Sequence, residues 1–277
     1  MVSRLWQVLV RAVLRLRTGD AMLYAGGVSF YALLALFPGL TLVVTLYSVF
    51  TTPAKAAAEA ATLSAIMPPA VQGLVHTELQ KIVRTSVRAL SFQGVVSFAI
   101  GVFAAHRGVK ALLTGLQFIY GDVKARAAFA FNIRALLVGL VSFVLLTLAS
   151  VGVVAARLLT AALHVHALPR SALLNPWSWA GLALLVGLTW LYRNSISIRP
   201  VSLFAATVAG ASATILTLAA SWLCAIYVTK VVNLGATYGS FGAAIVFLIW
   251  LSWSVNGILF GAAVAAELEQ EFKSQKT

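Results

Sequence analysis

Long apolar stretches alternate with short polar connections along the whole chain. Most of the stretches are long enough for a helix to cross a hydrocarbon core about 30 Å thick. Six of them can be distinguished, at 24–50, 91–105, 133–156, 177–192, 200–229 and 242–266. They do not show the alternation of apolar and polar positions that a membrane β-barrel needs. The sequence therefore predicts an all-α polytopic membrane protein, with a bundle of six transmembrane helices forming one domain over 1–277.

The segments outside the apolar stretches are assigned by their position and composition. The longest is rich in small and polar residues and contains Pro53 and the pair Pro68–Pro69, so we expect a helical cap outside the membrane. The assigned segments are an amino-terminal interfacial helix, an extracytoplasmic helical cap, a cytoplasmic connection and a cytoplasmic tail, at 1–19, 51–90, 106–132 and 267–277.

The amino-terminal segment is amphipathic when it is drawn as a helix. At about 100° per residue, its arginines gather on one face and an aromatic-aliphatic set lies opposite. The two faces consist of Arg4, Arg11 and Arg15 against Trp6, Leu9, Val13 and Leu16. Such a helix suits the plane of the membrane interface. The alternative is a solvated helix that packs on the rest of the protein.

Composition supports the membrane assignment and gives an orientation. Hydrophobic residues make up 61% of the chain and charged residues 10%, whereas about a quarter of a soluble domain is charged. The basic residues behind the net charge of +13 lie between the apolar stretches, which indicates anionic membrane lipids rather than nucleic acid as the partner. With six spans both termini share one side, and 13 of the 20 lysines and arginines fall on that side. This predicts cytoplasmic termini.

The first predicted span contains the uncharged sequence GGVSFYALLALFPGL. It belongs to an uncharged run of 34 residues, which as one helix would be about 51 Å long and must tilt, bend or lie partly in the interface. Pro38 removes a backbone hydrogen bond and is expected to kink the helix. Gly26 and Gly27 are expected to let a neighbouring helix approach closely. Ser29 and Tyr31 are candidates to line a cavity, and packing alone is the alternative explanation.

Basic residues follow the second predicted span directly, in the sequence HRGVK. Arg107 and Lys110 are therefore expected near the inner boundary of the hydrocarbon core. Two interpretations remain open. The side chains either reach out to headgroups and fix the topology, or face the bundle interior and receive an anionic headgroup.

The last predicted span carries a polar stripe and a pair of glycines. Ser252, Asn256 and Glu267 share one face at helical spacing. A buried asparagine in hydrocarbon needs a partner, so the stripe is expected to face the bundle or a cavity. Gly257 and Gly261 form a GxxxG on another face, which favours close helix contact within the bundle or in a homodimer.

Three motifs, in order along the chain, resemble the YihY/BrkB family of inner-membrane proteins, formerly labelled ribonuclease BN-like. They are SFYALLALFPGL in the first span, NSISIRPVSLFAATVAG before the fifth, and YGSFGAAIVFLIWLSWSVNGILFGAAVAAEL in the last. In the last motif Tyr238, Gly239, Trp250 and Gly261 stand at the family spacing. The resemblance covers nearly the whole chain and implies a bacterial inner-membrane protein with a bundle of six helices.

Two positions depart from the family pattern. Ala35 stands where the family usually has serine, and Ala263 stands where it usually has glutamate. Glu267, one helical turn after Ala263, is expected either to replace that carboxylate in part or to begin a solvated tail. The resemblance leaves the activity open. One branch was once labelled ribonuclease BN, another was named for serum resistance, and transport of lipid-like envelope material has been suggested.

The sequence offers no catalytic or cofactor site. A hydrolase needs an acid, a base and a nucleophile or activated water, but none of the seven acidic residues lies centrally in a predicted span. His164 and His166 have no cysteine or carboxylate near them in sequence. No glycine-rich phosphate loop with its lysine is present. We therefore expect no enzyme activity, no metal and no cofactor.

The leading hypothesis is a transporter or flippase-like handler of an amphiphilic, anionic envelope molecule. The six-span bundle, the basic cytoplasmic rim and the polar stripe of the last span favour it. A non-catalytic membrane scaffold for envelope partners is the alternative, favoured by the size of the predicted cap. A membrane-associated ribonuclease is the least favoured interpretation.

Overall fold

In the computed structural model every described element is helical. The described residues are 2–18, 21–48, 69–84, 92–121, 130–142, 144, 176–195, 200–228 and 241–274, with isolated positions in 52–68. The helices are α1 (Val2–Thr18), α2 (Ala21–Ser48), α4 (Pro69–Arg84), α5 (Phe92–Tyr120), a shorter helix (Ala130–Ser142), α8 (Pro176–Ser195), α9 (Leu203–Ile226) and α11 (Gly242–Ser274). No strand occurs among the residues just given, which confirms the all-α class.

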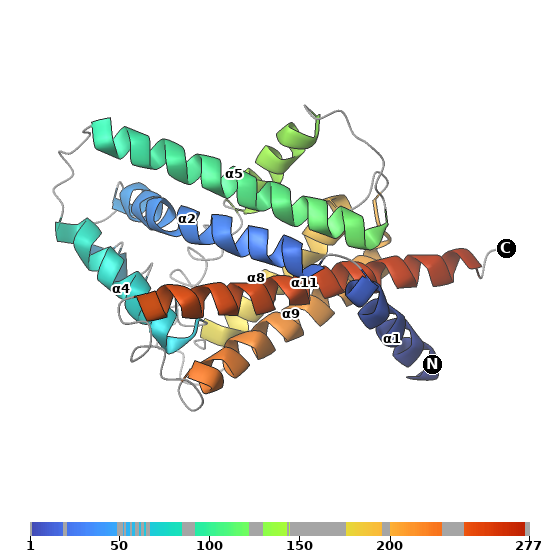
Figure 1. Cartoon of the computed structure of the whole chain (residues 1–277). Helices are drawn as coiled ribbons and strands as arrows, with labels where there is room; N and C mark the ends of the chain where they lie inside the picture. Colours follow the sequence, from blue (N-terminus) through green and yellow to red (C-terminus); the bar gives the residue numbers. More distant parts are fainter. Residues whose placement is uncertain are drawn as a thin grey trace, which may run out of the picture.

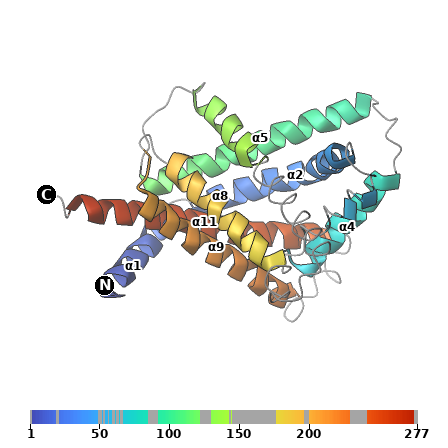
Figure 2. The ribbon, with the colours of Figure 1, turned by 180° about the vertical axis from the view of Figure 1, so that it is seen from behind.

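Helix α11 is the central helix of the bundle (Figure 1). It packs against α9, α2, α5 and α8, and also against α1 and α4. All residues of 261–268 are buried. Both termini and α1 lie at one end of the bundle and α4 lies at the other end, in both views (Figures 1 and 2).

Three helices in the described part of the chain are long and apolar enough to cross a membrane. The candidate spans are Ala21–Thr41 in α2, Leu203–Ile226 in α9 and Gly242–Phe272 in α11. The predicted count of six spans is therefore not confirmed. Helices α5 and α8 correspond to two further predicted spans, and the predicted span 133–156 falls largely outside the described residues.

Helix α5 continues well beyond residue 105, where the second span was expected to end. It runs as one helix to Tyr120, and Gly121 follows with a φ of 87°. The amide of Gly121 donates to the carbonyls of Gln117 and Phe118, as in a helix that ends on a left-handed glycine. The charges of HRGVK do not stop the helix, because solvated or paired cations are compatible with helical backbone. The predicted connection 106–132 thus begins as a continuation of α5.

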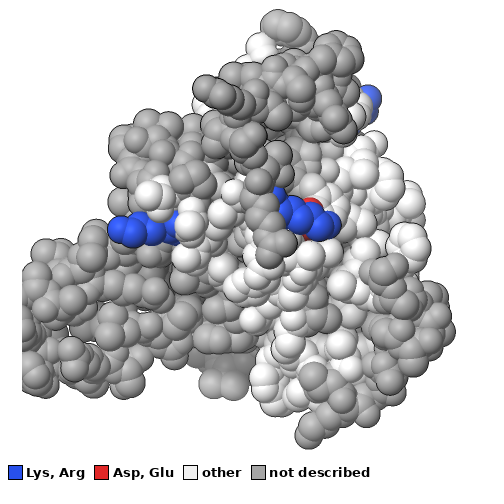
Figure 3. All heavy atoms as spheres, turned by 90° about the vertical axis from the view of Figure 1, so that its left-hand side faces the viewer, with Lys and Arg blue, Asp and Glu red and all other residues white. Residues whose placement is uncertain are grey.

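Helix α4 packs on the end of the bundle opposite the termini. Its Val71 is fully buried in a cluster with Phe247 and Trp250 of α11. Its Leu79 packs in a second cluster with Val44 of α2. Seen from this end, the described surface is mostly uncharged, with a few lysine and arginine side chains and a small acidic area beside one of them (Figure 3). The predicted cap region therefore contains a helix that is attached to the bundle through apolar side chains.

Candidate functional site

Helix α5 packs against α2 through glycines spaced seven residues apart. Each glycine lies against a bulkier residue of α2, so the two backbones approach closely and run antiparallel. A Cβ atom built on any of the three glycines would lie within 3.3 Å of its partner. The pairs are Gly101 with Pro38, Gly108 with Tyr31 and Gly115 with Tyr24. Matching seven-residue periods on both helices define one register between them.

Pro38 is part of this seam between α2 and α5. Helix α2 continues through Pro38 as one helix, and its ribbon changes direction towards the carboxyl-terminal end (Figure 1). A Cβ atom on Gly101 would overlap the proline ring. The absence of a side chain at Gly101 therefore leaves space for the ring of Pro38. The proline that was predicted to kink α2 thus also packs between α2 and α5.

The register places two cations beside the amino-terminal half of α2. Gly108 faces Tyr31, which lies ten residues after Ala21, the first residue of the candidate span, and α2 continues to Ser48. Arg107 is the neighbour of Gly108, so at 1.5 Å per residue it lies about 15 Å along the helix from the level of Ala21. Lys110 lies within one turn of Arg107. The expected position of the two cations near the inner boundary of the hydrocarbon core stays a prediction.

The two cations have different surroundings. Arg107 is exposed, with its guanidinium carbon 5.2 Å from the centroid of the Phe103 ring. Lys110 is half-buried, donates to Asn132 Oδ1 at 2.8 Å and lies 5.8 Å from the centroid of the Phe131 ring. In the described part of the chain neither cation is ion-paired with a carboxylate. Arg107 thus faces outward rather than into the bundle, and Lys110 links α5 to the short helix that contains Asn132.

The residues expected to line a cavity in the first span take part in packing. Ser29 is buried and donates to the Ala25 carbonyl at 2.7 Å. Tyr31 is half-buried in the seam with α5. A Cβ atom on Gly26 or Gly27 would have no neighbour within 4 Å. The close approach expected at these two glycines therefore occurs at the glycines of α5 instead.

Polar side chains of α11 form hydrogen bonds within α11 or with the neighbouring helix α9. Asn256 is half-buried and donates to the Ser252 carbonyl of its own helix at 2.8 Å. Trp250 Nε1 donates to Ser221 Oγ of α9 at 2.8 Å. The Ser221 hydroxyl in turn donates to the Thr217 carbonyl at 3.1 Å. Trp250 thus joins α11 to α9, whereas Asn256 is satisfied within α11.

The two glycines of the GxxxG motif serve contacts inside the chain. A Cβ atom on Gly257 would lie 3.0 Å from Leu216 Cβ of α9. Gly261 lies against the ring and hydroxyl of Tyr192 in α8, and that hydroxyl donates to the Ile258 carbonyl at 2.7 Å. The motif is therefore used within the bundle. Tyr192 is fully buried, but a tyrosine in an apolar run gives no sequence signal of such a role.

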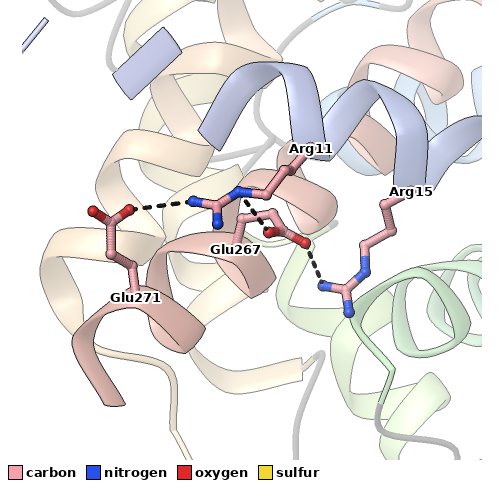
Figure 4. A network of polar contacts seen from close by, with 4 residues as sticks. All are labelled: Arg11, Arg15, Glu267 and Glu271. Carbon is pink, nitrogen blue, oxygen red and sulfur yellow. Dashed lines mark ion pairs between the residues drawn. The ribbon is translucent and has the colours of Figure 1, made fainter. Parts of the chain in front are cut away.

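Four charged side chains join α1 to the carboxyl-terminal part of α11 (Figure 4). Arg15 Nη1 lies 3.3 Å from Glu267 Oε1, and Arg11 Nε lies 3.4 Å from Glu267 Oε2. Arg11 Nη2 also lies 3.6 Å from Glu271 Oε2. Helix α11 continues to Ser274, and Glu267 is only 8% exposed. Glu267 is therefore a buried ion-pair partner within a helix and not the first residue of a solvated tail.

The spacing of these four residues explains their geometry. Arg11 and Arg15 are one helical turn apart, as are Glu267 and Glu271, so each pair lies on one face of its helix. Arg15 Nη2 is also 3.7 Å from a Cβ position built on Gly121, at the end of α5 where the helix dipole favours a cation. The two spacings are visible in the sequence, but nothing in it indicates that the two faces meet.

Comparison with known proteins gives the family. The family model described as virulence factor BrkB matches residues 12–277. The chain belongs to the BrkB family. Membership in this family and the three apolar helices together identify a membrane protein. No curated protein and no solved structure matches the chain.

Three of the BrkB motif residues that the structure describes lie at contacts between helices. Pro38 faces α5, Trp250 bonds to α9, and Gly261 faces Tyr192 of α8. The motif residues Tyr238 and Gly239, and the paired histidines of the sequence HVH, fall outside the described residues. Among the residues that are described, no group of three or more histidine, cysteine or acidic side chains is placed to hold a metal ion.

Ala263 and Glu267 lie one helical turn apart in α11, on nearly the same face. Ala263 is fully buried, and Glu267 is buried as well. The carboxylate of Glu267 contacts two arginines of α1. That Glu267 in part replaces the glutamate expected at position 263 stays a prediction.

Proposed function

We propose that this membrane protein accommodates and moves an anionic amphiphile of the bacterial envelope, and that Arg107 and Lys110 receive its headgroup. The observation that carries the proposal is the position of Arg107, which is exposed and lies about 15 Å along the bundle from the level of Ala21, the first residue of a candidate span. An arginine within a span is costly, by up to about 2.5–3.5 kcal/mol at the span's centre on insertion scales. A bound anion removes much of that cost, so the position favours an anionic ligand over a neutral one.

The surface beside Arg107 suits the apolar part of such a molecule. Ile100, Phe103 and Arg107 follow at i, i+3 and i+7 and are all exposed, so they form one outward stripe on α5. Acyl chains can lie along the two apolar side chains while the headgroup contacts the guanidinium. Lys110, oriented by Asn132, supplies a second cation one turn further along the helix.

We place the protein in the inner membrane with both termini in the cytoplasm. Arg11, Arg15 and Arg17 of α1 lie at the terminal end of the bundle (Figure 1). A concentration of arginine next to the ends of spans supports a cytoplasmic location by the positive-inside rule. The anionic lipids of the cytoplasmic leaflet are then on the side from which Arg107 can be reached along α5.

A non-catalytic scaffold for envelope partners is the second candidate. One observation favours it: α4 is held on the bundle by Val71, which is fully buried beside Phe247 and Trp250. A helix attached in this way presents a fixed surface at the end opposite the termini. Such a surface can recruit a partner without any movement of lipid.

Both candidates are non-enzymatic, and the carboxylates support this choice. General acid–base chemistry needs a carboxyl group that is directed at a substrate. Each carboxylate in the described part of the chain instead holds a structural contact. These contacts are Glu78 with Lys81, Glu267 with Arg11 and Arg15, Glu269 with the Ser202 amide, and Glu271 with Arg11.

Lipid transfer in proteoliposomes tests the proposal. The purified protein is reconstituted in phosphatidylcholine vesicles with a trace of fluorescent phosphatidylglycerol, and dithionite reduction measures how fast the probe crosses. We expect Arg107→Ala to slow transfer about tenfold, which corresponds to the loss of about 1.4 kcal/mol from a charge-assisted contact. Arg107→Lys keeps the cation and is expected to retain most of the transfer.

The control variant is Arg17→Ala, which removes an exposed cation from outside the seam. Equal transfer by Arg107→Ala and Arg17→Ala would exclude Arg107 as the headgroup contact. A folded protein that neither binds nor moves phosphatidylglycerol would favour the scaffold. Cleavage of RNA by a preparation free of soluble nucleases would reinstate the ribonuclease interpretation.

A further inference from the structure

The two sides of α1 differ in what they contact. Val8 and Ala12 are fully buried against the bundle. Arg11 and Arg15, which lie on the same side, pair with carboxylates of α11. The opposite side of α1 exposes apolar residues that follow one another at intervals of about one helical turn. Trp6 is the most exposed of them, at 67%. Among the described side chains of α1, the exposed apolar ones are Trp6, Leu9, Val10, Val13 and Leu14.

A candidate span with an exposed apolar start follows α1 closely in the chain. Helix α1 ends at Thr18 and α2 begins at Ala21. At the start of α2, Met22 is 83% exposed and Leu23 is 73% exposed. Outward apolar side chains on a membrane span lie against lipid. The apolar face of α1 therefore ends, at Leu14, eight residues before the lipid-facing Met22.

We propose that α1 lies in the membrane interface with this apolar face towards the acyl chains, held in place by its ion pairs with α11. The occupant of the face is the lipid surface itself. A tryptophan at the edge of an apolar face is typical of the interface, where its ring sits at headgroup level. Exposed apolar patches of this kind mark a membrane or a protein partner, and the closeness of α1 to the exposed apolar start of α2 along the chain favours the membrane.

The orientation differs from that of an ordinary basic amphipathic helix. Such helices bind anionic membranes partly through lysines and arginines that contact headgroups. Here Arg11 and Arg15 contact Glu267 and Glu271. Attachment of α1 to the membrane therefore depends chiefly on apolar insertion, and the charge of the lipids contributes less, through the exposed Arg17. This inference does not depend on the proposed lipid transfer.

Fluorescent labels on introduced cysteines test the orientation. Leu9→Cys and Val13→Cys place a bimane label on the apolar face, and Gln270→Cys places it at an exposed position of α11. The wild-type chain is the labelling control, because its single cysteine, Cys224, is buried. The labelled proteins are reconstituted in phosphatidylcholine with brominated acyl chains, with and without phosphatidylglycerol, at low and high salt.

We expect labels at positions 9 and 13 to lose about half of their emission to the brominated chains, because the apolar face of an interfacial helix lies about 5–10 Å deep. The loss is expected to be nearly the same in both lipid mixtures and at both salt concentrations. The label at position 270 is expected to keep its emission. Labels at 9 and 13 that behave like the label at 270 would overturn the inference.

Two further outcomes would also overturn it. Quenching that requires phosphatidylglycerol and disappears at high salt would mean that headgroup attraction holds α1, because salt screens that attraction. Protection of both labels from lipid together with energy transfer between labelled copies would mean that a second chain covers the face. Since Leu9→Cys and Val13→Cys lie at exposed positions, the fold is expected to tolerate both.

Discussion

At the scale of single residues, Glu267 determines where α1 lies. Its carboxylate is buried and contacts two arginines of α1. Removing one partner of a buried ion pair destabilises a protein by about 3–5 kcal/mol, because it leaves a charge without compensation. The Arg11 and Arg15 side chains are 51% and 24% exposed, so water can solvate them in part. We therefore estimate a loss of about 1–3 kcal/mol, between the buried and the surface case.

This leads to a prediction for variants of the α1–α11 contact. Glu267→Gln is expected to lower the melting temperature of the detergent-solubilised protein by several degrees. Glu271→Gln is the matched control, since Glu271 is more exposed and lies farther from Arg11, at 3.6 Å, and its effect is expected to be smaller. The double variant Arg15→Gln with Glu267→Gln is expected to regain part of the loss. Equal melting temperatures for the two single variants would argue against a structural role of Glu267.

At the scale of the elements, the glycines of α5 fix its register on α2. The three positions differ in how closely α2 approaches. A Cβ atom on Gly101 would overlap Pro38, and one on Gly115 would lie 2.9 Å from Tyr24 Cβ. At Gly108 the nearest atom is 3.3 Å away. A methyl group therefore needs the most rearrangement at Gly101 and the least at Gly108.

Alanine substitutions along α5 test this order. Gly101→Ala is expected to destabilise the protein by about 1–3 kcal/mol, the usual cost of overpacking. Gly115→Ala is expected to cost less, and Gly108→Ala least. Gly27→Ala is the control, because a Cβ atom at Gly27 meets nothing within 4 Å and alanine favours helix by up to about 1 kcal/mol. Thermal unfolding of the four variants measures the order, and a cost at Gly27 equal to that at Gly101 would contradict the seam.

The seam also shows what the sequence reveals about these helices and what it does not. The seven-residue period of Gly94, Gly101, Gly108 and Gly115 can be read from the chain. Its meaning requires the partner helix and its direction, which come from contacts between residues far apart in sequence. Charge in HRGVK suggested an early end of the second span, but backbone geometry at Gly121 determines where the helix ends.

At the scale of the whole molecule, class and family follow from the sequence more readily than the number of spans. Long apolar runs are sufficient to predict an all-α membrane protein, and the motifs are sufficient to indicate the BrkB family, which the family match confirms. The number of spans depends on how each helix sits in the bilayer. Helix α5 has 29 residues and is about 43 Å long, which is longer than the hydrocarbon core is thick. Its apolar sequence, however, is interrupted by Arg107 and Lys110, so the sequence alone does not show whether it is a span.

Reporter fusions test the orientation and the path of α2 and α5. We expect a green fluorescent protein fused after Thr277 to fluoresce, because the termini are proposed to be cytoplasmic. Alkaline phosphatase inserted at Thr52, after α2, is expected to be active, since this enzyme needs the oxidising periplasm for its disulfides. The same enzyme inserted after Gly121 is expected to be inactive, because α5 returns antiparallel to α2. Activity at Gly121 with inactivity at Thr52 would invert the orientation, and activity at both would mean that α5 does not cross.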